Sequence, residues 1–146
     1  MSQQTYEHIL VGFDGSTPAK NAVRKAIALA EEINAKVTIA YIIDKQNIDL
    51  VLIAGYTNAV EEAEKVAKEE FEKLFNEINV PENINIVQEI RLGNPKLFIA
   101  KKLPEELNVD LIFCGATGTN AIERFILGSV AHHVINHSKV DVTVVR

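Results

Sequence analysis

The sequence predicts a single-domain α/β protein with an open, parallel five-stranded sheet and helices on both faces. Short apolar runs alternate with segments of helical periodicity along the chain, which indicates a parallel sheet with right-handed crossovers. These runs are apolar throughout rather than at every second residue, as is typical of strands buried on both faces. The length of 146 residues suits one domain, residues 1–146.

The first half of the chain contains two expected strands, residues 8–14 and 36–43. Ser16-Thr17-Pro18 predicts a helix start between them, because a hydroxyl can cap the first turn and proline fits within it. Apolar residues then recur at helical spacing: Ala19, Ala22, Val23, Ala26, Ile27, Ala30 and Ile33. Residues 44–57 include the apolar patch Leu50–Ala54, and they could form a short helix, a lid, a dimer contact or a disordered loop.

A long surface helix is expected over residues 58–79, where acidic residues precede lysines by four positions in the favourable orientation. Its apolar stripe comprises Val60, Ala63, Ala67, Phe71, Leu74, Phe75 and Ile78. A third strand over 84–90 is followed by a turn at 93–95. A short helix then carries Leu97, Ala100 and Leu103.

Three further elements complete the pattern: a strand over 109–114, a helix from about Ser129 to His137, and a strand over 140–145. The last strand is strongly β-forming and should lie at an edge of the sheet. Asp141 is the one residue within it whose charge disfavours pairing with another strand at this edge. Such an edge invites pairing with another chain.

Composition excludes several classes of function. The net charge is −5 with both signs interspersed, so we expect no binding of nucleic acid or of a membrane surface. No apolar stretch approaches the roughly 18 residues of a membrane span. A polar N-terminus without a signal peptide and a single cysteine predict a cytoplasmic protein.

The most informative pattern is Gly115-Ala-Thr-Gly118, followed after nine intervening residues by Gly128-Ser129. The first part follows a strand and the second begins a helix, so both can present backbone N–H groups to an anion. Glycine also permits close approach of a phosphate to the backbone. The pattern predicts a phosphate cradle, and the alternative is a set of ordinary turn and cap glycines.

Asp14 and Gly115 follow the first and fourth expected strands. If the strand order reverses between these strands, both residues lie where open α/β sheets bind ligands. Asp14 suits a ribose or Mg²⁺ role. Alternatively, Asp14-Gly15 is a simple turn pair.

Two other patterns have weaker functional interpretations. His133 and His137 are four residues apart on the last helix, but no Cys or carboxylate cluster lies nearby, so we expect no metal site. Cys114 could be a reactive thiol. We expect instead a small apolar side chain that packs under the ligand.

The pattern G-x2-G-x9-G-[ST] at the last connection from a strand to a helix follows a first strand Ile9-Leu-Val-Gly-Phe-Asp-Gly-Ser16 and precedes a C-terminal Val-Val-Arg. This combination resembles the universal stress protein family. Arg91-Leu-Gly-Asn-Pro95 also looks like the family's turn after its third strand. The likeness covers essentially the whole chain. It implies strand order 3-2-1-4-5, membership of the ATP-binding branch, and a homodimer formed by antiparallel pairing of residues 140–145.

The resemblance also implies roles for individual residues. Asp14 would lie near the ribose and adenine, and Ile42 would contact adenine through its backbone. The ribose and phosphates would be held by Gly115, Gly118, Gly128, Ser129 and Val130. Many relatives place a basic or histidine side chain between the first two glycines, whereas this chain has Ala116 and Thr117.

Thr117 can form hydrogen bonds with the ligand but brings no charge, and Arg124 is a candidate to supply one. The resulting hypothesis is an ATP-binding protein, acting with Mg²⁺, that has a regulatory or sensing role in a stress response. No general base or activated nucleophile is recognisable in the sequence. A slow ATP hydrolase and a protein-interaction module that binds no nucleotide are the alternatives.

Overall fold

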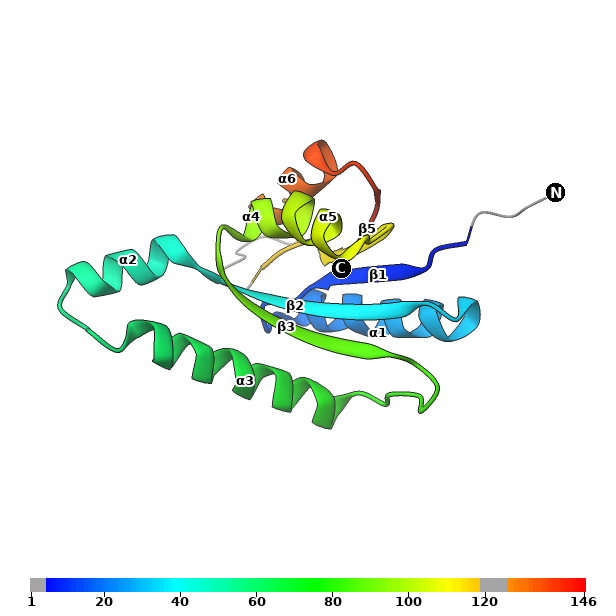
Figure 1. The fold of residues 1–146 in the computed structure, drawn as a ribbon, viewed down its shortest axis with the longest axis horizontal. Helices are drawn as coiled ribbons and strands as arrows, with labels where there is room; N and C mark the ends of the chain where they lie inside the picture. The colour runs from blue at the N-terminus through cyan, green and yellow to red at the C-terminus, as the bar shows by residue number, and fades with distance from the viewer. Residues whose placement is uncertain (1–4, 119–125) are drawn as a thin grey trace.

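The computed structural model describes residues 5–118 and 126–146. Its strands form one parallel sheet in the order β3-β2-β1-β4-β5, which confirms the predicted α/β class and the order 3-2-1-4-5 (Figure 1). The strands are β1 (His8–Gly12), β2 (Lys36–Asp44), β3 (Ile86–Gly93), β4 (Leu111–Gly115) and β5 (Asp141–Val145).

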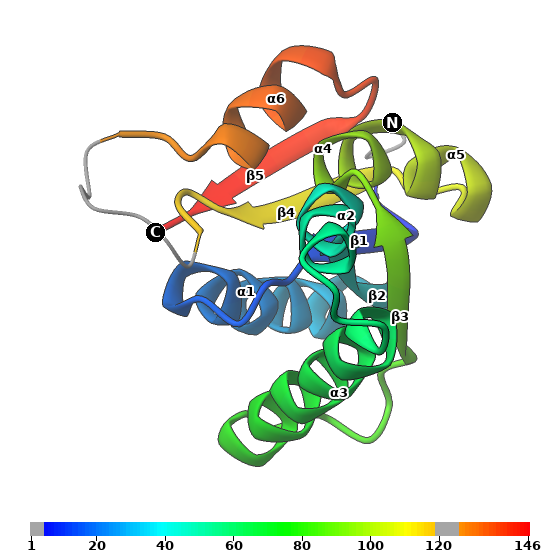
Figure 2. The same cartoon turned by 90° about the vertical axis from the view of Figure 1, so that its left-hand side faces the viewer.

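Helices cover both faces of the sheet, as predicted (Figures 1 and 2). One face is covered by α1 (Thr17–Ile33) and α3 (Ala59–Glu77). The other is covered by α6 (Ser129–His137) and by a continuous helical run made of α4 (Pro95–Leu97), a π-helical turn (Phe98–Lys102) and α5 (Leu103–Leu107). Each face therefore has its own apolar core.

The first core lies between β1, β2, α1 and α3 and contains Val23, Phe71 and Leu74. The second lies under the α4–α5 run and α6 and contains Leu103 and Val134. Burial of these side chains supplies most of the favourable free energy of folding. Because the two cores fix the helices on the sheet, they also fix the strand ends where a site can form.

Local signals explain where α1 begins and ends. Ser16 Oγ accepts a hydrogen bond from the Ala19 N–H at 3.3 Å, and proline occupies the first turn. At the other end Asn34 adopts a left-handed conformation with φ +59°, which ends the helix. The predicted start at Ser16-Thr17-Pro18 is confirmed.

The segment 44–57, which the sequence left open, contains helix α2 (Lys45–Ile53). Asp44 caps it, because its Oδ1 accepts a hydrogen bond from the Gln46 N–H at 3.0 Å. Within α2 only Ile48 is buried, and it packs beside Ala59 and Ile43. The helix extends beyond the carboxyl end of β2 (Figure 1).

Two predicted boundaries are wrong. β3 continues to Gly93 because it pairs with β2 as far as Asp44, so Gly93 belongs to a strand and not to the predicted turn. The helical run that begins at Pro95 continues to Leu107. It is longer than the short helix expected from Leu97, Ala100 and Leu103, and it ends before Asn108, which adopts a left-handed conformation with φ +55°.

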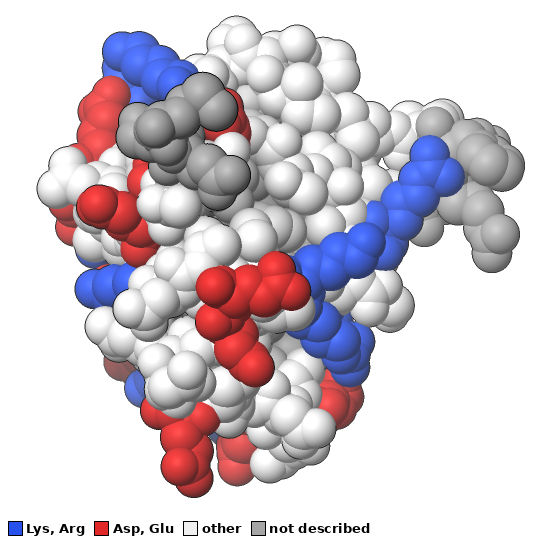
Figure 3. Space-filling model, turned by 90° about the vertical axis from the view of Figure 1, so that its right-hand side faces the viewer, with Lys and Arg blue, Asp and Glu red and all other residues white. Residues whose placement is uncertain are grey.

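The surface carries charges of both signs. On the side shown in Figure 3, Lys and Arg lie next to Asp and Glu around an extensive uncharged area. Among the described residues, no helix has the length and apolar character needed to cross a membrane.

Candidate functional site

A cavity of about 970 Å³ opens at the carboxyl ends of β1, β2 and β4. This is the switch point of the sheet, where the strand order reverses, because β1 lies between β2 on one side and β4 on the other. All the residues that the sequence singled out as a binding site line this one cavity: Asp14, Ile42, Gly115, Thr117, Gly118, Gly128, Ser129 and Val130. Arg124 lies outside the described residues.

The turn between β1 and α1 places Asp14 at the cavity. Its Oδ1 accepts a hydrogen bond from the Ser16 N–H at 3.0 Å, and Gly15 has φ +85°, a conformation that favours glycine. Asp14 therefore forms this turn, and its role toward a ligand stays a prediction. Its Oδ2 faces Gly118, because a Cβ at position 118 would lie 3.1 Å from this oxygen.

Gly115 has a packing role that the sequence did not reveal. A Cβ at this position would lie 2.8 Å from the backbone N of Ala19 and 2.9 Å from the carbonyl carbon of Pro18. The absence of a side chain therefore allows the first turn of α1 to lie directly against the end of β4. Gly115 brings Asp14 and the glycine loop together by permitting this contact.

Gly128 holds the two ends of the glycine segment together. Its N–H donates to the Ala116 carbonyl oxygen at 2.6 Å, and a Cβ would lie 3.2 Å from the Thr117 Cα. Gly128 is also the N-cap of α6, and no side chain of the described residues caps this helix. The first-turn N–H groups of α6 have no partner within the helix, and Ser129 and Val130 line the cavity.

The ionisable side chains of the cavity favour binding over covalent chemistry. Burial raises the pKa of the Cys114 thiol to about 11, so this residue is a protonated thiol at neutral pH. It is buried and lines the cavity, and its expected packing under a ligand stays a prediction. Burial also raises the pKa of Tyr41, and the nearby Glu70 and Asp14 carboxylates raise it further.

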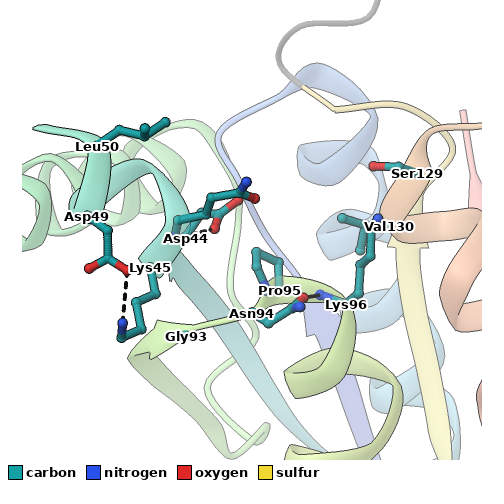
Figure 4. A pocket seen from close by; sticks show the side chains of 11 residues that line it. Asp44, Lys45, Asp49, Leu50, Gly93, Asn94, Pro95, Lys96, Ser129 and Val130 are labelled. Atoms are coloured by element: carbon teal, nitrogen blue, oxygen red, sulfur yellow. Dashed lines mark hydrogen bonds and ion pairs between the residues drawn. The ribbon is translucent and has the colours of Figure 1, made fainter.

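A second, smaller cavity of about 590 Å³ adjoins the first. It lies between α2, the turn from β3 to α4, and the start of α6 (Figure 4). Both cavities are lined by Asp44, Pro95, Ser129 and Val130, so they meet at the N-terminus of α6. The sequence analysis did not identify this cavity, because its walls come from three segments far apart in the chain.

The histidines of α6 lie close together. The ring centroids of His133 and His137 are 4.3 Å apart. Burial lowers the pKa of His133, as do the nearby charges of His137, Lys96 and His132. Within the described parts of the chain, no three His, Cys, Asp or Glu side chains are grouped as a metal site.

Comparisons with known proteins agree with the observed fold. The universal stress protein family model matches residues 5–146. A Staphylococcus haemolyticus protein named for this family is 40% identical over 143 residues, which cover 97% of this chain and 86% of that protein. The solved structure of the universal stress protein UspA from Lactobacillus plantarum is 28% identical, with a TM-score of 0.76 and coverage of 99% of this chain and 100% of that one.

A further solved structure is a universal stress protein in complex with cAMP. It is 28% identical to this chain, with a TM-score of 0.63, and the match covers 98% of each chain. The family model spans nearly the whole sequence, and the relatives match over nearly the whole fold. The chain therefore belongs to the universal stress protein family.

Proposed function

We propose that this chain binds ATP together with Mg²⁺ in the larger cavity, and that binding serves a regulatory or sensing role in a stress response. The observation that carries the proposal is the convergence of Asp14, Ile42 and the described residues of the glycine pattern on one cavity at the switch point of the sheet. The family assignment supports the role in stress. The proposal goes beyond the family assignment because it places the chain in the ATP-binding branch of the family.

The N-terminus of α6 is the element that suits phosphate. Its uncapped N–H groups and the positive end of its dipole favour an anion. Gly118 carries no side chain into the cavity beside Asp14 Oδ2, and Ser129 and Val130 line the same cavity at the start of α6. The phosphates would lie there, with the ribose beside Asp14 and adenine at the backbone of Ile42.

Mg²⁺ would neutralise charge on the phosphates. In nucleotide sites this ion is held by phosphate oxygens, water and one or two carboxylates. Asp14 Oδ2 fits this requirement, because it faces Gly118 while Oδ1 is occupied by the turn. The cAMP complex of a related protein supports an adenine nucleotide as the class of ligand.

A regulatory role fits the cavity better than rapid catalysis. The Cys114 thiol remains protonated, and the described lining of the larger cavity contains no histidine, lysine or arginine. Efficient phosphoryl transfer requires close neutralisation of charge and a positioned nucleophile. A true hydrolase would turn over at about 1 s⁻¹ or faster, and we expect slower turnover than this.

Calorimetric titration of nucleotide-free protein tests the proposal. Wild type should bind ATP with Mg²⁺ at micromolar concentration, with GTP, AMP and cAMP as comparators. Gly118→Val should abolish binding, because its side chain would fill the space beside Asp14. A thermal melt of the variant controls for folding. No heat and no thermal stabilisation of wild type at millimolar ATP would overturn the proposal.

We also propose a homodimer through β5. This strand is at the edge of the sheet, and its residues alternate between exposed and half-buried from Asp141 to Val144. Tyr6 Oη donates to Asp141 Oδ2 at 2.6 Å, which holds the one charged side chain of the strand at its start. Antiparallel pairing of two copies would provide partners for the unpaired backbone N–H and C=O groups of this edge. Light scattering should therefore give a dimer mass at micromolar concentration.

A further inference from the structure

The described part of the proposed phosphate site has a deficit of positive charge. Ala116 and Thr117 bring no cation between the first two glycines, and the described lining of the larger cavity contains no lysine or arginine. ATP carries several negative charges, and the dipole of one helix offsets only part of them. A cation from another part of the chain would complete the site.

Lys96 lies at the right place to supply this charge. It belongs to the first turn of α4, where its backbone N–H donates to Asn94 Oδ1 at 3.0 Å. Its side chain lines the smaller cavity together with Ser129 and Val130. Figure 4 shows it extending from α4 along Val130 toward the start of α6.

Lys96 is also the cation of the two cavities that has no ion-pair partner among the described residues. In the part of the chain that the structure describes, Lys45 and Lys96 are the cations that line either cavity. Lys45 Nζ lies 2.9 Å from Asp49 Oδ2, so Lys45 already has a carboxylate partner. Lys96 forms no ion pair with another described residue, and its side chain is half-buried.

The positive charge of Lys96 acts on a residue of α6. Its positive charge is one of the causes that lower the pKa of His133 in the second turn of that helix. Asp44 is the carboxylate common to both cavities, and its Oδ1 is occupied by the cap of α2. A flexible ammonium group near an uncapped helix N-terminus is chemically suited to a phosphate.

We propose that Lys96 binds a phosphate group of the nucleotide and replaces the basic residue that is missing between Gly115 and Gly118. The inference rests on the proposed function, because it assigns a further residue to the same site. Its ligand is the phosphate, whereas the nucleoside is held by the larger cavity. Lys96 therefore contributes to the affinity for ATP and not to that for adenosine.

The test compares ATP and adenosine as ligands of Lys96→Gln by calorimetry. We expect on the order of tenfold weaker binding of ATP, since a charge-assisted hydrogen bond is lost, and unchanged binding of adenosine. Lys96→Arg should retain most of the affinity for ATP. Lys101→Gln is the matched control, because Lys101 is exposed and lies in the same helical run, away from both cavities.

The outcomes separate this inference from the proposed function. If Lys96→Gln binds ATP as wild type does while Gly118→Val does not, Lys96 has no role and ATP binding stands. An equal loss for ATP and adenosine, or an equal loss in Lys101→Gln, would also overturn the role of Lys96 in phosphate binding. If wild type binds neither ligand, both proposals fail.

Discussion

Replacing Gly115 by alanine should destabilise the fold itself. The new Cβ would lie 2.8 Å from the Ala19 N and 2.9 Å from the Pro18 carbonyl carbon. Both are backbone atoms of the first turn of α1, so neither can rotate away. Relief requires that α1 moves from the end of β4, and overpacking of this kind costs about 1–3 kcal/mol. We take about 2 kcal/mol, which corresponds to a fall of about 4–8 °C in Tm.

Gly118→Ala is the matched control for this prediction. Its Cβ would lie 3.1 Å from Asp14 Oδ2, the far end of a side chain that can yield by a few tenths of an ångström. We therefore expect its free energy of unfolding to remain within about 0.5 kcal/mol of that of wild type. Urea unfolding followed by far-UV circular dichroism, with equal m-values, measures both variants.

The contrast between the two glycines is the informative result. Gly115→Ala should lower the urea midpoint and Gly118→Ala should not. Equal midpoints for Gly115→Ala and wild type would refute the argument that α1 lies directly against the end of β4. A larger loss in Gly118→Ala than in Gly115→Ala would show that the glycine loop, and not this helix contact, is the tightly packed element.

Three further predictions concern other parts of the molecule. Burial lowers the pKa of His8 below its ordinary 6.5, where its Nε2 pairs with Thr38 Oγ1 at 2.7 Å. The folded state then binds fewer protons than the unfolded chain, so the stability that His8 contributes is complete above pH 6.5 and lost as the pH falls through the folded pKa. Urea unfolding at about pH 7.5 and about pH 5.5 should show this loss, and His8→Gln should reduce the difference. Leu103→Ala should cost about 2–5 kcal/mol, because Leu103 is fully buried; a loss below about 1 kcal/mol in the same unfolding assay would contradict the packing of α5. Thr143→Lys places a charge at the centre of the β5 edge and should convert the proposed dimer to a monomer by light scattering, and an unchanged dimer mass would exclude pairing through β5.

The fold was predictable because its signals are local. Each strand that is buried on both faces is an apolar run, and α1 carries its own cap at Ser16. Helix α2 was the exception. Its apolar residues Leu50–Ile53 are exposed and form no single buried stripe, so periodicity could not assign them. The cap at Asp44 was the one available signal for this helix.

The site was predictable in part. The glycine pattern and the strand ends brought the predicted residues to one cavity, where their roles as ligands of a nucleotide remain a prediction. The sequence could not indicate that Gly115 serves helix packing, because its contact with Pro18 and Ala19 crosses between β4 and α1. Nor could it indicate Lys96, which lines the same cavity as Ser129 only because α4 packs beside α6.

Chemical-shift mapping of ¹⁵N-labelled protein with ATP and Mg²⁺ tests the central claim most directly, because it locates the ligand without a substitution. We expect the largest changes at the backbone N–H groups of Gly118, Ser129 and Val130, with smaller ones at Ile42. Adenosine should shift Ile42 while leaving Ser129 and Val130 nearly unchanged. Saturable shifts confined to residues outside the cavity, or none at millimolar ATP, would contradict the assignment of the glycine segment as the phosphate site.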